Sequence, residues 1–132
     1  MKSRADLVRG WLRKSQSDMD NASLCLASAQ ALDTVCFHAQ QAAEKCLKAY
    51  LVAKEVEFPL VHNIEKLIEL CARTDAAFMA MKPLGQSLTP YAVELRYDEE
   101  FWPTLDTARQ ALDAAATIRR FVVDRLPDVP GA

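Results

Sequence analysis

Five polar side chains with binding chemistry occur within the stretch CFHAQQAAEKCLKAYL, residues 36–51. They are His38, Gln41, Glu44, Lys45 and Lys48. At about 100° per residue they share a helix arc that is roughly 120° wide. Ammonium groups can contact phosphates, while an imidazole and an amide can hydrogen-bond a base or a sugar. The spacing therefore allows a ligand-binding surface, and equally a solvated helix face in which Glu44 and Lys48 form an i,i+4 ion pair.

Two further polar side chains fall where the helical pattern is apolar. Gln40 lies in the apolar arc of the same helix, so its amide must find hydrogen-bond partners. Arg119 lies in the apolar stripe of the C-terminal helix and needs an acceptor. Asp18, inside the apolar arc of the first helix, is a candidate partner. We favour a structural pair between helices over a phosphate-binding arginine.

The elements that must position these residues are all helical, because no stretch of useful length alternates with period two. The predicted elements begin with a helix over residues 4–30, a second over 33–54 and a short third after residue 63. Two short helices or one kinked helix over 74–90 follow, then a further turn or two before Pro103 and a last helix over 104–126. The fold class is therefore an all-α bundle with three long helices. One domain spans residues 1–126 and a tail follows over 127–132.

Local signals set the expected ends of these helices. Asp33, Asn63 and Thr104 are the predicted N-caps of the second, third and last helices. Pro83 and Gly85 are expected to interrupt the helical pattern between residues 74 and 90.

Composition excludes several classes of protein. The net charge is −2, so the chain has no global basic excess for gripping nucleic acid, and nucleic acid is a less favoured partner. The four cysteines form no Cys-x-x-Cys pair and are expected to be reduced and buried, with no metal site. Neither a signal peptide nor a membrane span is apparent, which favours a cytoplasmic protein.

Three segments together carry a family resemblance: HAQQAAEKCLKAYL, PLVHNIEKLIELC and YAVELRYDEEFWPT. In their order and spacing the chain resembles the HEPN family, the higher-eukaryote and prokaryote nucleotide-binding domain. The resemblance implies an antiparallel four- to five-helix up-and-down bundle that forms a homodimer. It also implies a possible minimal nucleotidyltransferase partner, in a two-component or toxin–antitoxin-like pair.

Many members of that family are metal-independent endoribonucleases whose Arg is followed four to six residues later by a His. Arg96 stands at the position of that Arg, but residues 100–103 are Glu, Phe, Trp and Pro. Glu94, Asp98, Glu99 and Glu100 surround Arg96 in sequence and are expected to repel an RNA phosphate and to satisfy the guanidinium. We therefore predict no catalytic residues.

The leading hypothesis is a non-catalytic HEPN protein that binds a nucleotide, a nucleotidyltransferase partner, or both. The candidate ligand-binding residues are His38, Gln41, Glu44, Lys45, Lys48, Arg96 and Tyr97. Lys45 and Lys48 are expected to contact phosphates, His38 and Gln41 the base or sugar, and Arg96 to organise a dimer groove. No cofactor is expected other than the nucleotide itself.

Two alternatives remain. The first is an endoribonuclease that uses His38 or His62 in place of the missing imidazole. The second is a purely structural interaction domain, in which Phe101 and Trp102 form a partner surface. For these two aromatic residues we favour packing of the last helix against the bundle over exposure to a partner.

Overall fold

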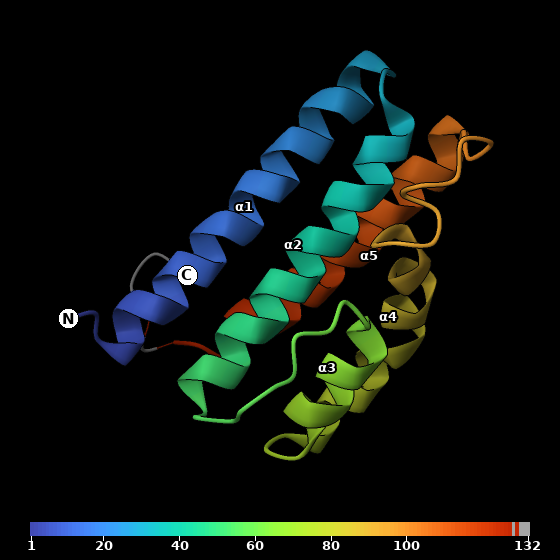
Figure 1. Cartoon of the computed structure of the whole chain (residues 1–132). Helices are drawn as coiled ribbons and strands as arrows, with labels where there is room; N and C mark the ends of the chain where they lie inside the picture. The colour runs from blue at the N-terminus through green and yellow to red at the C-terminus, as the bar shows by residue number, and fades with distance from the viewer. Residues whose placement is uncertain (128, 130–132) are drawn as a thin grey trace.

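The computed structural model describes residues 1–127 and 129, and it confirms an all-helical bundle. The elements are α1 (Arg4–Ser28), α2 (Leu32–Ala53), α3 (Ile64–Ala72), the 3₁₀ helix η1 (Ala76–Met81), α4 (Lys82–Leu88), the 3₁₀ helix η2 (Thr89–Tyr91) and α5 (Leu105–Val123). Over these residues the chain contains no strand and no helix long and apolar enough to cross a membrane. Three long helices lie side by side, and the short α3 and α4 pack against one side of α2 and α5 (Figure 1). Most of the predicted tail, residues 127–132, lies outside the described residues.

Helix α2 forms the centre of the bundle. Its buried side consists largely of small residues, among them Ala39, Ala43 and Cys46, which have no exposed surface. Small side chains let neighbouring helices approach closely. As a result α2 contacts α1, α3 and α5, and its polar residues Gln40, Glu44 and Lys48 are buried as well.

The start of α2 differs from the prediction. The sequence predicts Asp33 as the cap, but the N-cap is Ala31, which makes no side-chain cap. Ala29 and Ala31 both adopt left-handed backbone angles, with φ of 54° and 51°, so the connection from α1 is very short. Asp33 instead lies in the first turn of α2, where its carboxylate is favourable beside the positive end of the helix dipole.

The other two predicted caps are confirmed. The side chain of Asn63 accepts a hydrogen bond from the backbone of Lys66 at the start of α3. The side chain of Thr104 accepts one from the backbone of Thr107 at the start of α5. Each cap fixes the residue at which a helix begins after an irregular segment.

The segment between α3 and α5 contains short helical pieces, as predicted, but the break is not at Pro83 or Gly85. Pro83 lies in the first turn of α4, where no hydrogen bond is lost. Gly85 is buried inside α4, and a Cβ there would lie 2.6 Å from Ile68 Cδ1 and 2.8 Å from Ile64 Cγ2. Instead, η1 passes directly into α4, and Met81 and Lys82 at the junction both have right-handed helical backbone angles. After η2, residues 92–97 form hydrogen-bonded turns rather than a regular helix.

Candidate functional site

Part of the polar arc of α2 is buried inside the bundle. The side chains of Glu44 and Lys48 are only 4% and 8% exposed, and Lys48 Nζ lies 3.0 Å from Glu44 Oε2. The i,i+4 pair predicted from the sequence is thus confirmed, but as a buried pair. Because both side chains are buried, water solvates neither charge, and each charge depends on its partner for stabilisation.

Glu44 is the centre of a group of hydrogen bonds that we call the Glu44 cluster: Glu44, Lys48, Gln40, Gln41 and His62. Glu44 Oε1 accepts from Gln40 Nε2 at 3.1 Å and lies 3.0 Å from His62 Nδ1. Gln40 Nε2 also donates to the His62 carbonyl at 2.9 Å, and Gln40 Oε1 accepts from Gln41 Nε2 at 2.6 Å. The buried amide of Gln40 is therefore fully satisfied, and the cluster ties the loop before α3 to α2.

Lys48 is enclosed further by aromatic rings. Its Nζ lies 5.5 Å from the ring centroid of Trp11 and 5.8 Å from that of Phe58. Cation–π attraction adds to the Glu44 ion pair in this partly dry environment. Lys48 is thus held inside the fold rather than presented to a ligand.

A second carboxylate organises the other end of the arc. Asp18 of α1 lies 2.8 Å from His38 Nδ1 through Oδ1 and 2.7 Å from Lys45 Nζ through Oδ2. The side chains of His38 and Lys45 remain 27% and 24% exposed. Asp18 therefore holds an imidazole and an ammonium group side by side at the surface between α1 and α2.

The predicted pair between Asp18 and Arg119 is wrong. Arg119 Nη2 instead donates to the Leu12 carbonyl at 3.5 Å, and its buried Nε has no hydrogen-bond partner among the described residues. Asp18 is engaged elsewhere because His38 and Lys45 project from α2 directly toward its carboxylate. The sequence correctly predicts that a carboxylate in the apolar arc of α1 needs partners. Those partners lie on α2 and not on α5.

Arg96 reaches α2 from the turns that follow η2. Its guanidinium carbon lies 4.3 Å from the ring centroid of Phe37, and the Phe37 ring meets the His38 ring edge-on at 5.2 Å. With Asp18 and Lys45 these three side chains form a continuous series that we call the Arg96–Lys45 row. The row brings together two cations, an imidazole, a carboxylate and an aromatic ring.

The acidic residues around Arg96 do not satisfy it, contrary to the prediction. No ion pair joins Arg96 to Glu94, Asp98, Glu99 or Glu100 within residues 1–127. The guanidinium lies on Phe37 instead, while the Asp98 carboxylate accepts a hydrogen bond from the Glu100 backbone. Arg96 itself is exposed and its charge is available.

Comparison with known proteins places this chain in a family. The family model of the HEPN domain matches residues 8–126 of the chain. The chain belongs to the HEPN domain family. Among solved structures it is similar to ST0689, an archaeal HEPN homologue, with 21% identity, a TM-score of 0.72, and coverage of 95% of this chain and 98% of that one. It is also similar to TT1696 from Thermus thermophilus, with 26% identity, a TM-score of 0.75, and coverage of 90% and 98%. No match to the chain is found among curated proteins.

The two histidines of this HEPN domain share one arrangement. His38 and His62 each place Nδ1 beside a carboxylate, of Asp18 and Glu44 respectively. A carboxylate at Nδ1 favours the proton there and leaves Nε2 as the acceptor nitrogen of the neutral ring. His62 also lines a small pocket of about 210 Å³ together with Asn63 and Glu94. His38 belongs to the Arg96–Lys45 row, and His62 does not.

The aromatic residues before α5 behave differently from one another. Phe101 is partly buried and lies 5.6 Å from the Tyr91 ring, in keeping with packing of the last helix. Trp102 is 73% exposed, so the expectation that it packs against the bundle is wrong. It lies in the irregular segment before α5. Tyr97 is 81% exposed, beside Arg96.

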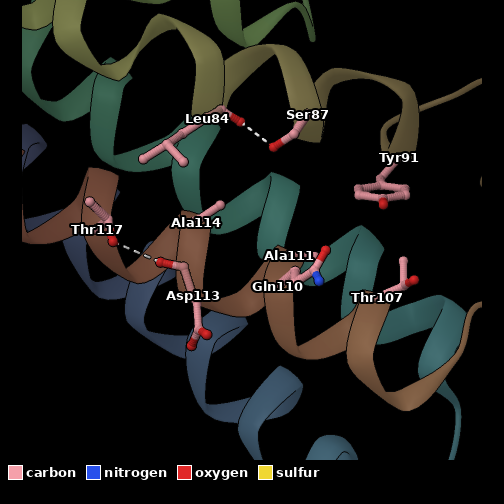
Figure 2. Close-up of a pocket in the computed structure, with 9 residues that line it drawn as sticks. All are labelled: Leu84, Ser87, Tyr91, Thr107, Gln110, Ala111, Asp113, Ala114 and Thr117. Atoms are coloured by element: carbon pink, nitrogen blue, oxygen red, sulfur yellow. Dashed lines mark hydrogen bonds between the residues drawn. The ribbon is translucent and has the colours of Figure 1, made fainter.

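A separate pocket of about 390 Å³ lies between α4 and α5, and none of the predicted site residues lines it (Figure 2). Two of its hydroxyl groups are used within their own helices, because Ser87 donates to the Leu84 carbonyl and Thr117 to the Asp113 carbonyl. Its lining contains no cation. This pocket therefore lacks the group that an anionic ligand needs.

Proposed function

We propose that this HEPN protein is a non-catalytic binding protein whose ligand is a nucleotide, held along the Arg96–Lys45 row. The observation that carries the proposal is that Arg96, although distant in sequence, lies on Phe37 and extends the His38–Asp18–Lys45 series. The row combines cations for phosphates with aromatic surface for a base, the two kinds of contact that a nucleotide requires.

The burial of the side chains suggests how the predicted roles are divided. Arg96 and Lys45 contact phosphates, the exposed Tyr97 beside Arg96 offers its ring face to the base, and His38 hydrogen-bonds the sugar or base through Nε2. Asp18 holds His38 and Lys45 in position, but its negative charge offsets part of the positive charge of the row. The affinity should therefore be modest, in the micromolar to millimolar range.

Glu44, Lys48 and Gln41 support this surface from beneath rather than contacting the ligand. Their hydrogen bonds and ion pair are internal to the Glu44 cluster, and the Lys48 side chain is only 8% exposed. Their role is to fix the side of α2 that carries the row.

Isothermal titration with ATP, GTP and their monophosphates tests the proposal. We expect Arg96→Ala and Lys45→Ala each to weaken binding roughly tenfold or more, since each loses a charge-assisted contact. Lys66→Ala is the matched control, because Lys66 is exposed on α3 outside the row. Absence of heat at millimolar nucleotide would refute nucleotide binding and leave a protein partner as the ligand.

A minimal nucleotidyltransferase is the second candidate ligand. The observation in its favour is the exposure of Tyr97 next to Arg96, which gives a partner an aromatic and a cationic contact on one turn. Co-purification with the product of a neighbouring nucleotidyltransferase gene tests it. Tyr97→Ala should then reduce recovery of the partner, whereas Lys66→Ala should not. Failure of both ligands would leave an interaction domain with another partner.

Ribonuclease activity is the remaining alternative, and we propose that it is absent. The imidazole expected four to six residues after Arg96 is missing, and Phe37 lies between Arg96 and His38. Incubation with single-stranded and structured RNA, without metal, should give no cleavage. Cleavage abolished by His38→Ala or by His62→Ala would overturn this statement.

A further inference from the structure

A cavity of about 520 Å³ lies at the end of the bundle where α1 begins and where α2 and α5 end (Figure 1). Its volume lies in the range of small-molecule sites in proteins. None of the residues that line it belongs to the Arg96–Lys45 row or to the Glu44 cluster. The cavity is therefore separate from the candidate nucleotide site.

The interior of this cavity is aliphatic. Val8 of α1 and Leu126 after α5 are 1% and 5% exposed, and Ala53 and Val129 add to the apolar lining. Apart from cations, the described residues that line the cavity offer no aromatic ring, hydroxyl or side-chain amide. A nucleobase would therefore lack a stacking surface here. An alkyl chain needs no such surface, because its burial is favourable in proportion to its apolar area.

Three cations border the aliphatic interior, Arg4, Lys54 and Arg125, and no acidic residue of the described chain lines it. Two of them are oriented by acids that lie outside the lining. Arg4 Nη2 lies 2.6 Å from Glu55 Oε1, and Arg125 Nε lies 2.8 Å from Asp75 Oδ2. Lys54 makes no ion pair with the described residues. The lining as a whole is therefore complementary to an anion.

Arg125 and Lys54 are both held while keeping donors for a ligand. Arg125 Nη1 donates to the Phe121 carbonyl at 3.1 Å, and the guanidinium carbon lies 3.4 Å from the centroid of the Phe121 ring. Its Nη2 makes no hydrogen bond with the described residues. Lys54 Nζ lies 5.6 Å from the centroid of the Tyr50 ring, and an ammonium group has three donors.

These two cations lie near one carboxylate. The pKa of Asp75 is lowered by the Ala77 backbone N–H and then by the Arg125 side chain, and Lys54 also contributes. A second carboxylate that enters the cavity can therefore approach both cations and accept charge-assisted hydrogen bonds from them.

Two acids and two helix ends limit this attraction. Glu55 and Asp75 each offset one cation of the lining. The C-terminal ends of α2 and α5 add partial negative charge at the same end of the bundle. We therefore expect a dissociation constant in the micromolar to millimolar range, most of it contributed by the alkyl chain.

We propose that this cavity binds a free aliphatic carboxylate of medium chain length. The alkyl chain lies against Val8 and Leu126, and the carboxylate lies between Lys54 and Arg125. The site shares no residue with the Arg96–Lys45 row, so it stands whether or not the protein binds a nucleotide. An anionic membrane surface offers the same combination of charge and alkyl chain, and the experiment separates these two sources.

Isothermal titration of the full chain with sodium hexanoate and sodium octanoate tests the proposal. Octanoate should bind roughly tenfold tighter than hexanoate, because two further methylene groups are buried. Its dissociation constant should rise with salt. Octyltrimethylammonium has the same chain and the opposite charge, so it should give no heat at the same concentrations.

Two variants locate the site. Lys54→Gln should raise the dissociation constant for octanoate roughly three- to tenfold, because it removes the cation that has no ion pair. Ala5→Phe should raise it tenfold or more, because Ala5 is an exposed residue of the lining and the larger side chain fills the cavity. Lys66→Gln and Ala27→Phe, at exposed positions elsewhere, are the matched controls and should bind octanoate unchanged. Circular dichroism checks that each variant is folded.

Several results would overturn the proposal. They are absence of heat at millimolar octanoate, equal affinity for hexanoate and octanoate, an equal response to the octyl cation, and a dissociation constant unchanged by both Lys54→Gln and Ala5→Phe. Co-sedimentation with vesicles of equal parts phosphatidylglycerol and phosphatidylcholine, without binding of octanoate, would also overturn it and identify a membrane surface as the partner.

Discussion

Replacing Glu44 by methionine should be among the most destabilising single changes on the polar side of this protein. The change removes the carboxylate that Lys48, Gln40 and His62 all contact. His62 is largely solvated and Gln40 keeps its bond to the His62 carbonyl, so the main cost falls on Lys48. Its ammonium group would be left as an unpaired charge in a site where the side chain is 8% exposed.

The expected magnitude follows from that burial. Removing one partner of a buried ion pair costs about 3–5 kcal/mol, which is a large share of a total stability of about 5–15 kcal/mol. For a chain of this length the loss corresponds to a fall in Tm of roughly 10–20 °C. The double variant Glu44→Met/Lys48→Met removes both charges, so its stability should lie within about 1–2 kcal/mol of the unaltered protein.

Urea denaturation of the four proteins in this double-mutant cycle measures the coupling. We expect a coupling energy of about 2–4 kcal/mol between Glu44 and Lys48. The exposed pair of Glu69 and Lys82 is the matched control and should give less than about 1 kcal/mol. If the two methionine substitutions were simply additive, the reasoning that Lys48 is buried and dependent on Glu44 would be refuted.

Three further predictions concern the surrounding fold. Gly85→Ala should lower the free energy of unfolding by about 1–2 kcal/mol in urea denaturation, because the clash with two buried isoleucines of α3 exceeds the gain in helix propensity. A variant of equal or greater stability would contradict the close packing of α4 on α3. The Ala77 backbone N–H and the Arg125 side chain lower the pKa of Asp75 below its usual 3.8. The difference in Tm between the unaltered protein and Asp75→Asn should therefore be present above about pH 4 and disappear as the pH falls through the lowered pKa; a pH-independent difference would exclude the charge as its origin. Burial raises the pKa of the Cys36 thiol to about 11, so at pH 8 a disulfide reagent should modify the partly exposed Cys25 first and Cys36 only on unfolding; equal rates in the folded protein would contradict this burial.

Local features of the fold were predictable from the sequence where the cause itself is local. Asn63 and Thr104 each bond a backbone group within three residues, and Glu44 and Lys48 lie one helical turn apart. Asp33 was predicted wrongly because the start of α2 depends on two left-handed alanine residues, Ala29 and Ala31, a strained choice that composition does not indicate.

The candidate site was predictable in its residue types but not in its pairing. A helical wheel shows that His38, Lys45 and Lys48 share a side of α2, yet it cannot show what covers that side. Burial of Lys48 is caused by Phe58 from the following loop and Trp11 from α1, which only the tertiary packing brings there. The same holds for Arg96, whose contact with Phe37 joins segments far apart in the chain.

The chain contains two histidines, which allows one measurement to locate the ligand directly. In a ¹H–¹³C NMR titration with ATP, the imidazole signals of His38 should shift with the dissociation constant found by calorimetry, while those of His62 should stay nearly constant. His38→Ala and His62→Ala assign the two sets of signals. If neither imidazole shifted at millimolar ATP, or if only His62 did, the Arg96–Lys45 row would not be the nucleotide site.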